Sequence, residues 1–180
     1  MKWASINDVS HNRPGIHVSS SSYNIIANNT IQSNEGQGIG LYWGSSNNVI
    51  ESNEASNNGR GIDIYSSHHN IIENNNVSSN GYSGIFLEDS SNNTISNNSA
   101  NSNWAIGIGF TSSSNNNIID NNALNNGGGE SAFTKVLQKT TLSITMHRTT
   151  KVESPSPGIL HIISSSAIPS SQMGVESTLA

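Results

Sequence analysis

The sequence predicts an all-β protein: a right-handed parallel β-helix of about five 23-residue coils with three sheets, followed by a tail without repeats. Three observations predict this fold. A Gly-Ile pair recurs at a fixed interval, apolar residues keep in phase with it, and asparagine recurs at set places between the pairs. The pairs begin at Gly15, Gly38, Gly61, Gly84 and Gly107, each 23 residues after the last. Such an interval is typical of a solenoid, in which each coil packs only on its neighbours.

Each coil is expected to begin with a short strand, because Gly61-Ile62-Asp63-Ile64 alternates apolar and polar residues and so places both isoleucines on one face. The inward columns of this first strand are Ile16, Ile39, Ile62, Ile85, Ile108 and Val18, Leu41, Ile64, Leu87, Phe110. A third column (Ile26, Ile50, Ile72, Ile95, Ile119) and a fourth (Ile31, Ala55, Val77, Ala100, Leu124) predict two further strands. Three strands per coil would then surround one apolar interior.

Asparagine is expected at the corners between these strands. The two columns are Asn24, Asn48, Asn70, Asn93, Asn117 and Asn29, Asn53, Asn75, Asn98, Asn122. Asparagine tolerates left-handed backbone angles, and its amide both donates and accepts, so stacked copies can bond along the column. The alternative for so much asparagine is disordered low-complexity sequence. Four apolar columns in phase argue against disorder.

Composition narrows the class of protein. Apolar residues make up 32% and charged residues 11% of the chain, and the formal net charge is −5. This is little apolar content for a compact globule, but a solenoid tolerates it. The absence of cysteine excludes disulfides and thiolate metal sites. The acidic balance argues against a nucleic-acid partner, and no segment is long enough to cross a membrane.

The chain is expected to divide into a β-helix at residues 1–126 and a tail at 127–180. Asn7 to Asn12 match Asn53 to Asn58 at the same distance before the glycine, so the chain begins within a coil, and we expect a fragment of a longer protein. Its uncapped coil ends would promote self-association. The first 126 residues hold 29 asparagines, whereas the last 54 hold none. The tail therefore has a different origin from the coils.

We hypothesise that a shifted reading frame produced the tail. Read one base earlier, the codons of Thr140 and Thr141 can both encode asparagine, and the shifted stretch can read Asn-Asn-Thr-Leu-x-Asn-Asn-Ala, close to Asn92 to Ser99. The alternative is a genuine, degenerate tail, which the Gly158-Ile159 echo of Gly15-Ile16 favours. On the frameshift hypothesis the tail is poorly ordered and carries no functional site. Sequencing the gene decides between them.

The outward positions of the first strand are the candidate ligand surface. Aromatic and acidic residues gather there in the middle coils: Tyr42, Trp43, Asp63, Tyr65, Phe86 and Glu88. Flat rings suit the face of a sugar and carboxylates suit its hydroxyls, so these six are the candidate carbohydrate-binding residues. The alternative is a set of ordinary cross-strand contacts among solvated acids.

Catalytic and metal sites have fewer candidates. Asp63 and Glu88 on adjacent coils, with Asp89 beside them, could reach the separation of roughly 5 to 9.5 Å used by paired glycosidase carboxylates. Glu51 and Glu73 are expected in one column, with Asp120 in the same column two coils further on. Because like charges on neighbouring coils repel each other, these carboxylates are either screened by solvent or bridged by a calcium ion. His68-His69 suggests a metal site, but no third ligand is in view. No phosphate loop or Ser/His/Asp order is present.

Two stretches carry a family resemblance. Gly84-Ile85-Phe86-Leu87 and the run from Ser90 to Asn98 resemble the repeats of NosD-like and pectin-lyase-like β-helix proteins, over about residues 3–126. The resemblance implies an exported location, extracellular, cell-surface or periplasmic. The proteins that the chain resembles include polysaccharide lyases and hydrolases, a periplasmic accessory factor for copper enzymes, and surface proteins. The calcium-binding aspartates and basic residue of the lyases have no match, because Arg60 is the only basic residue between Arg13 and Lys135.

We therefore expect a β-helix module of the cell envelope or exterior with a structural or carbohydrate-binding role, and a polysaccharide or surface glycan as partner. The first alternative is a fragment of a polysaccharide hydrolase or lyase. The second is a copper accessory role, which depends on the resemblance together with His68 and His69. No cofactor is expected apart from the possible calcium ion at the stacked glutamates.

Overall fold

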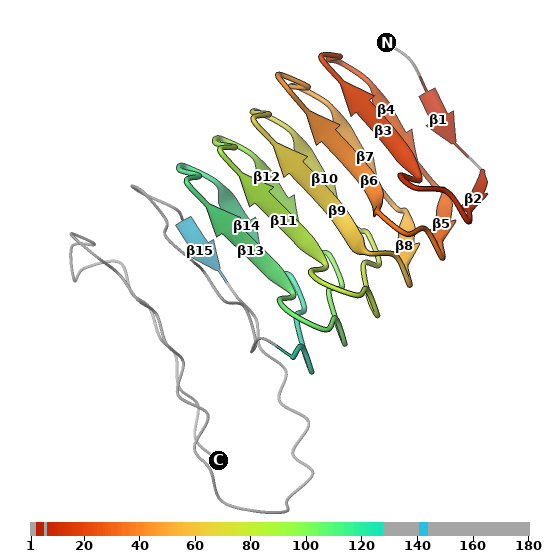
Figure 1. Cartoon of the computed structure of the whole chain (residues 1–180). Coiled ribbons are helices and arrows are strands. Elements are labelled where there is room, and N and C mark those ends of the chain that lie inside the picture. The colour runs from red at the N-terminus through yellow and green to blue at the C-terminus, as the bar shows by residue number, and fades with distance from the viewer. Residues whose placement is uncertain (1–2, 6, 128–140, 144–180) are drawn as a thin grey trace, which may run out of the picture.

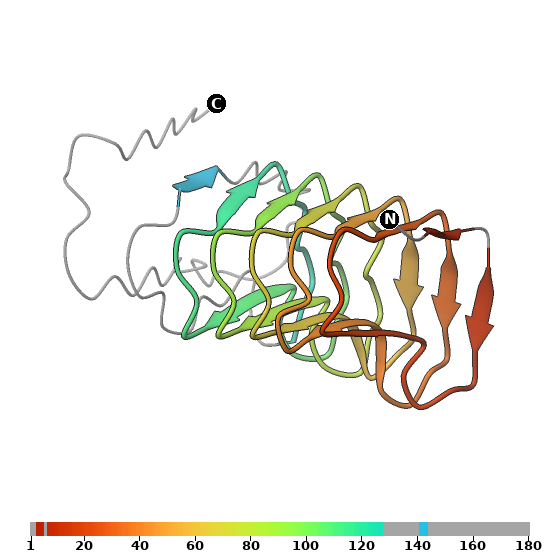
Figure 2. The same cartoon turned by 90° about the horizontal axis from the view of Figure 1, so that it is seen from above.

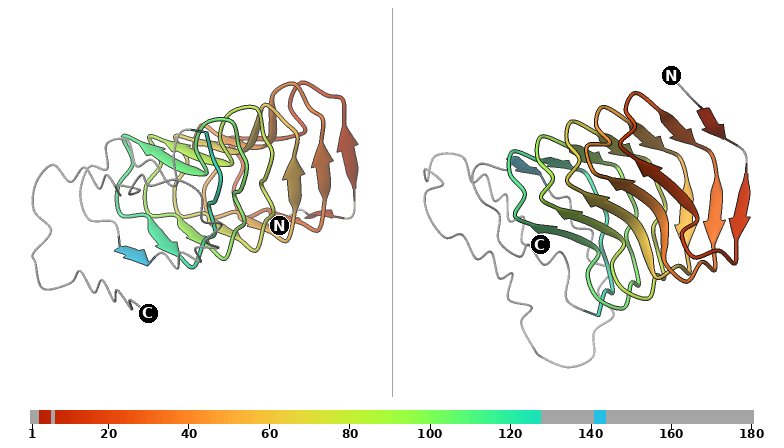
Figure 3. Two further views of the ribbon diagram at one scale, coloured as in Figure 1. Left: turned by 90° about the horizontal axis from the view of Figure 1, so that it is seen from below. Right: turned by 45° about the horizontal axis from the view of Figure 1, so that its top comes forward.

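A computed structural model describes residues 3–5, 7–127 and 141–143, which form fifteen short strands and no helix. All pairings are parallel and join strands one coil apart, so the chain winds into a stack of coils (Figure 1). The right-handed parallel β-helix with about five coils is confirmed. Seen along other directions, each coil encloses an interior bounded by three walls (Figures 2 and 3).

The walls are three sheets, named here A, B and C. Sheet C contains β3 (Ile16–Ser19), β6 (Gln37–Tyr42), β9 (Arg60–Tyr65), β11 (Ile85–Glu88) and β13 (Ile108–Thr111). Sheet A contains β1 (Trp3–Ser5), β4 (Ile25–Ala27), β7 (Val49–Glu51), β10 (Ile71–Glu73), β12 (Thr94–Ser96), β14 (Asn117–Ile119) and β15 (Thr141–Ser143). Sheet B contains β2 (Asp8–Ser10), β5 (Thr30–Gln32) and β8 (Glu54–Ser56), and single bridges at Asn76, Ser99 and Asn122 continue it.

The interior is the predicted apolar core. Both columns of the first strand line it, and from Ile39 to Leu87 their side chains have no exposed surface. The third and fourth columns are confirmed through Ile95 and Ala100. Within each sheet, identical or similar branched side chains lie directly above one another, for example Ile50, Ile72 and Ile95. This stacking keeps apolar surface away from water in a coil that contacts only its neighbours.

The prediction is wrong by one residue in the last coil. Ile118, not Ile119, pairs with Ile95 and is buried. Likewise Asn116, Asn121 and Ala123 occupy the places predicted for Asn117, Asn122 and Leu124. The run Asn115-Asn116-Asn117-Ile118-Ile119 offers an asparagine and an isoleucine in either register. The structure takes the register that keeps Ile118 inside, since a slip of one residue turns every side chain to the other face.

Asparagine ladders join the coils at the corners, as predicted. Asn75 is representative: its backbone N–H and its Nδ2 both donate to Oδ1 of Asn98 in the next coil, at 2.9 and 3.0 Å. The same Nδ2 donates to the carbonyls of Ile50 and Glu73, and its Oδ1 accepts from Asn53. Two further ladders were not predicted: Asn12, Asn34, Asn58, Asn80, Asn103, Asn126, and the serines Ser45, Ser67, Ser90, Ser113.

The left-handed angles are not at the ladder residues themselves. They occur one residue earlier, as at Asn74 (φ 56°) before Asn75 and Ser66 (φ 47°) before Ser67. The assignment of these angles to the ladder asparagines is therefore corrected. The left-handed residue bends the chain at the corner, and the residue that follows it can then direct its side chain into the stack.

Little of the predicted tail lies within the described residues. In β15, Leu142 pairs with Ile118 and extends sheet A by one strand. Apart from residue 127 and residues 141–143, the residues for which poor order and no functional site were expected lie outside the described part, and the shifted reading frame remains a prediction. Among the described residues, no helix is long and apolar enough to span a membrane.

Candidate functional site

The outer face of sheet C carries the predicted surface residues in the predicted rows. Strand pairing places His17, Gly40, Asp63, Phe86 and Gly109 in one row across the coils. It places Ser19, Tyr42, Tyr65, Glu88 and Thr111 in the next row. Because side chains of a parallel strand alternate between faces, both rows point away from the apolar interior.

Tyr42 leans across this face and connects its neighbours. A side-chain atom added to Gly40 would lie 2.3 Å from Cε2 of Tyr42, so the ring lies over the bare backbone of that glycine. On one side it stacks on the ring of His17, with 4.8 Å between centroids and 19° between planes. On the other side its hydroxyl donates to Oδ2 of Asp63 at 2.6 Å. Gly40 therefore makes room for an ordered aromatic contact.

Asp63 is engaged through both oxygens. Its Oδ1 accepts from Nη1 of Arg60 at 2.8 Å, three residues earlier on β9, and its side chain is only 12% exposed. The guanidinium of Arg60 lies 4.9 Å from the ring centroid of Phe86, within the range of a cation–π contact. A connected line of side chains thus crosses four strands of sheet C: His17, Tyr42, Asp63, Arg60 and Phe86.

These contacts bear on the candidate catalytic residues. Register pairs Glu88 with Tyr65, so Glu88 is diagonal to Asp63, and Asp89 is exposed at the corner after β11. Both oxygens of Asp63 accept hydrogen bonds, from the hydroxyl of Tyr42 and from Arg60, and this arrangement suits a residue that holds its neighbours in position. A catalytic role for Asp63, Glu88 and Asp89 remains a prediction.

Alkaline pH is expected to destabilise the wild type more than the Tyr42→Phe variant. Burial, followed by the charge of Asp63, raises the pKa of Tyr42 far above its ordinary value of 10.0. The unfolded chain releases this proton near the ordinary pKa, while the folded chain keeps it. The contribution of the protonated Tyr42 side chain to the free energy of unfolding is therefore fully present below about pH 10 and is lost as the pH rises further. Urea midpoints measured on both sides of that pH test this, and equal losses in both proteins would contradict it.

Trp43 extends the aromatic cluster into solvent. It follows β6 directly, with a left-handed φ of 50°, and is 60% exposed. Its ring centroid lies 5.7 Å from that of Tyr42 and 6.5 Å from that of His17. Tyr65, one coil further along the row of Tyr42, is half-buried. The structure therefore brings together Tyr42 and Trp43, while Phe86 joins them only through Arg60 and Asp63.

Sequence reasoning missed three exposed aromatic side chains, Tyr23, Tyr82 and Trp104. All three lie at corners, outside the alternating strand from which the candidates were taken. Tyr82 and Trp104 are one coil apart, just before β11 and β13, and the 23-residue repeat could have revealed that neighbourhood.

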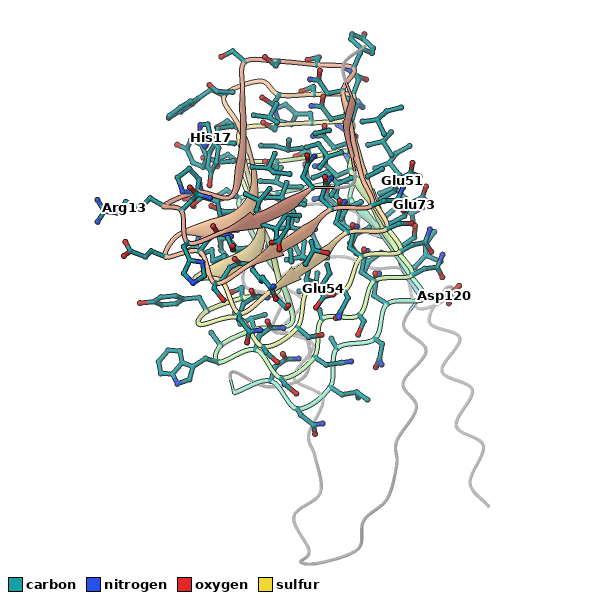
Figure 4. The ribbon with its side chains drawn as sticks, turned by 90° about the vertical axis from the view of Figure 1, so that its right-hand side faces the viewer. Arg13, His17, Glu51, Glu54, Glu73 and Asp120 are labelled. Carbon is teal, nitrogen blue, oxygen red and sulfur yellow. The ribbon has the colours of Figure 1, made fainter. Side chains whose placement is uncertain are left out.

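The candidate metal ligands are dispersed. Glu51 and Glu73 pair in register on the outer face of sheet A, but Asp120 does not continue their column, because Ile119 pairs with Ser96. Figure 4 shows Glu51 and Glu73 on the side of the coil opposite His17 and Arg13. In the part of the chain that the structure describes, no three His, Cys, Asp or Glu residues are placed to share a metal ion.

His68 has a structural partner instead. The ring Nδ1 of His68 accepts a hydrogen bond from the backbone N–H of Ser91 at 3.0 Å. The backbone N–H of His68 donates to Oγ of Ser46. It therefore takes the place that serine occupies at Ser22, Ser46, Ser91 and Ser114 in the other coils. His69 is exposed at the corner beside it.

The geometry defines a class of protein: a parallel β-helix whose outer sheet C face carries aromatic side chains tied together by an acid and an arginine. The chain belongs to the NosD family, described as periplasmic copper-binding protein, whose sequence model matches residues 3–150. Comparison with curated protein sequences found no match.

Several solved structures have the same fold. The periplasmic alginate epimerase AlgG is 24% identical with a TM-score of 0.73, covering 80% of this chain and 39% of that one. The A-module of the Azotobacter vinelandii mannuronan C-5 epimerase AlgE6 is 19% identical with a TM-score of 0.66, covering 76% and 39%. Tailspike protein 2 of Escherichia coli O157:H7 bacteriophage CAB120 is 19% identical with a TM-score of 0.63, covering 78% and 22%. The chain thus spans 39% of the first epimerase, and these identities show the fold alone.

The copper in the family's description can be compared with the residues present. Copper prefers imidazole, thiolate or thioether ligands in sets of three or more. Among the described residues, His68 and His69 are the only adjacent pair of histidines, and Nδ1 of His68 already accepts a hydrogen bond. The described residues therefore do not fit a resident copper site.

Proposed function

We propose that this chain is a carbohydrate-binding β-helix module of the cell envelope, and that it binds an uncharged glycan on the outer face of sheet C. The observation that carries the proposal is the exposed ring of Trp43 beside Tyr42 and His17. The C–H faces of a sugar ring pack on such rings, while its hydroxyls bond to polar side chains beside them. Tyr42 is held from both sides, so little side-chain freedom is lost on binding.

The preference for an uncharged glycan follows from the charges on the coils. The described residues carry nine acidic side chains and two arginines, Arg13 and Arg60. Both arginines are paired, with Glu35 at 3.5 Å and with Asp63 at 2.8 Å. On the coils that the structure describes, a polyanion such as alginate would meet a negative surface on which both arginines already have an acidic partner.

The comparisons support a location and a general role. The family description and AlgG both name a periplasmic protein, which supports an envelope location. The epimerases act on polysaccharides by their names, which supports a carbohydrate ligand on this fold. The engagement of Asp63 favours binding over hydrolysis, and a purely structural role is the second candidate, favoured by the fully bonded ladders.

Trp43→Ala is expected to weaken binding to a neutral glycan by more than about tenfold, because truncating a central aromatic side chain of a binding site typically costs about 2 kcal/mol or more. Ligands are first found on an array of neutral and anionic polysaccharides, and affinities are then measured by calorimetry. Ile71→Ala is the control, because it removes an exposed apolar side chain from sheet A. Reducing-sugar release is assayed on the same ligands.

The proposal fails if the wild type retains no neutral glycan, if it prefers alginate, or if Trp43→Ala binds as the wild type does. Release of reducing ends would show an enzyme instead.

A further inference from the structure

Tyr82 and Trp104 form a second exposed aromatic pair. Their ring centroids are 6.0 Å apart with planes at 77°, and the residues are 58% and 72% exposed. They precede β11 and β13, whereas Trp43 follows β6. The two aromatic groups therefore lie at opposite ends of the strands of sheet C.

The neighbouring coils place only small residues at the positions that correspond to Tyr82 and Trp104. In the preceding coil the place of Tyr82 is taken by Gly59, and in the next coil by Ala105. The position equivalent to Trp104 is Gly81 in the preceding coil and Gly127 in the following one. The rings thus stand beside positions with little or no side chain, which leaves their faces accessible.

The backbone under both rings is fixed. The N–H of Tyr82 donates to the carbonyl of Gly59 at 2.7 Å, and the N–H of Trp104 donates to that of Asn80 at 3.0 Å. The carbonyl of Tyr82 accepts from Ala105 at 2.9 Å. Exposed aromatic side chains on a fixed backbone, with no charged group in the pair, form a ready platform for an uncharged ring.

We infer that Tyr82 and Trp104 are a second stacking platform for the same glycan chain, which crosses the outer face of sheet C obliquely. This inference rests on the proposed function. Positions in different coils can be compared by counting from the glycine of the Gly-Ile pair. Tyr82 lies two residues before Gly84, and Trp43 lies five residues after Gly38, two coils earlier. Along the strand direction the platforms are seven residues apart, at about 3.3 Å per residue, and along the coil axis they are two coils apart, at about 4.8 Å per coil. The two perpendicular distances combine to roughly 25 Å.

The surface between the platforms follows the same diagonal. Phe86 lies on the coil of Tyr82, Arg60 and Asp63 lie on the next coil back, and Tyr42 lies on the coil of Trp43. These side chains are already linked by the contacts described above. A single sugar ring cannot reach both platforms, so the ligand class is an extended oligosaccharide or polysaccharide.

Binding is expected to depend on ligand length. Two linked contacts act together only when one ligand spans both, and the gain over one contact is then typically about a hundredfold or more. The probes are size-fractionated oligosaccharides, from disaccharides upward, cut from the neutral polysaccharide that the wild type retains most strongly. Affinity should rise steeply once the oligosaccharide reaches the roughly 25 Å between platforms.

Trp104→Ala is expected to abolish this rise, weakening long oligosaccharides by at least about tenfold while leaving disaccharides unchanged. Trp104→Phe keeps a ring and should restore much of the length dependence. Trp43→Ala should weaken ligands of every length. Melting temperatures show that each variant is folded.

Equal affinity of Trp104→Ala and the wild type for long oligosaccharides would overturn the second platform and leave the proposed function intact. If the affinity of the wild type does not change with oligosaccharide length, the second platform is likewise overturned and the proposed function stands. If no neutral glycan binds the wild type at all, both the proposed function and this inference are overturned.

Discussion

Replacing Ile72 with asparagine is expected to lower the free energy of unfolding by about 4 kcal/mol or more. Ile72 lies at the middle of β10, has no exposed surface, and stacks between Ile50 and Ile95. Losing a buried isoleucine typically costs about 2 to 5 kcal/mol. The new amide would add about 1 to 3 kcal/mol, because it would be buried without a designated partner.

Ile71→Asn provides the matched control. Ile71 is the preceding residue of the same strand, but it points outward and is 40% exposed. Its substitution should change the free energy of unfolding by well under half the amount found for Ile72→Asn, because no closed cavity forms. Urea unfolding followed by circular dichroism measures both variants. Equal midpoints would show that this column is not part of the core.

Asn75→Ala is expected to cost about 3 kcal/mol or more. The side chain makes five hydrogen bonds within the stack: three from Nδ2, and two accepted by Oδ1 from Asn53. Alanine would leave the backbone N–H of Asn53 buried without its acceptor, which costs about 1 to 3 kcal/mol, and it would also remove the Nδ2 bonds to the carbonyl of Ile50 and to Oδ1 of Asn98. The methyl group cannot replace any of these contacts.

The neighbouring Asn76→Ala is the control, since Asn76 is exposed and its side chain accepts only from the hydroxyl of Ser78. We expect it to stay within about 0.5 kcal/mol of the wild type. Chemical unfolding of the two variants side by side tests the difference. Similar losses in both would mean that the ladder amides are replaced by water.

Much of the fold could be predicted because the columns repeat. Five copies of Gly-Ile set the coil length, and period-two alternation around Ile62 set the inward face. The last coil was misplaced because three consecutive asparagines precede two isoleucines, so local pattern could not choose between Ile118 and Ile119. Pairing with Ile95 makes that choice, and pairing is a property of the whole stack.

The site was predicted only in part. Alternation placed Tyr42, Asp63 and Phe86 outward, and register confirmed their rows. Their contacts could not be predicted, because they depend on rotamers: Tyr42 bends back over Gly40, and Arg60 reaches Asp63 within the same strand.

One small departure from regularity shows how this architecture changes its size. The corner after β6 is one residue longer than the matching corners, although the interval from Gly38 to Gly61 stays at 23 residues; the extra residue is Gly44, whose φ of 79° and open surroundings let the chain bulge without moving Ser45 out of its ladder. Single insertions are thus tolerable at such a corner, whereas the same insertion within a strand would shift every column. Evolution can accordingly lengthen or shorten this molecule in whole-coil steps, by duplication or loss of a repeat, and vary its outline at the corners while the interior stays unchanged.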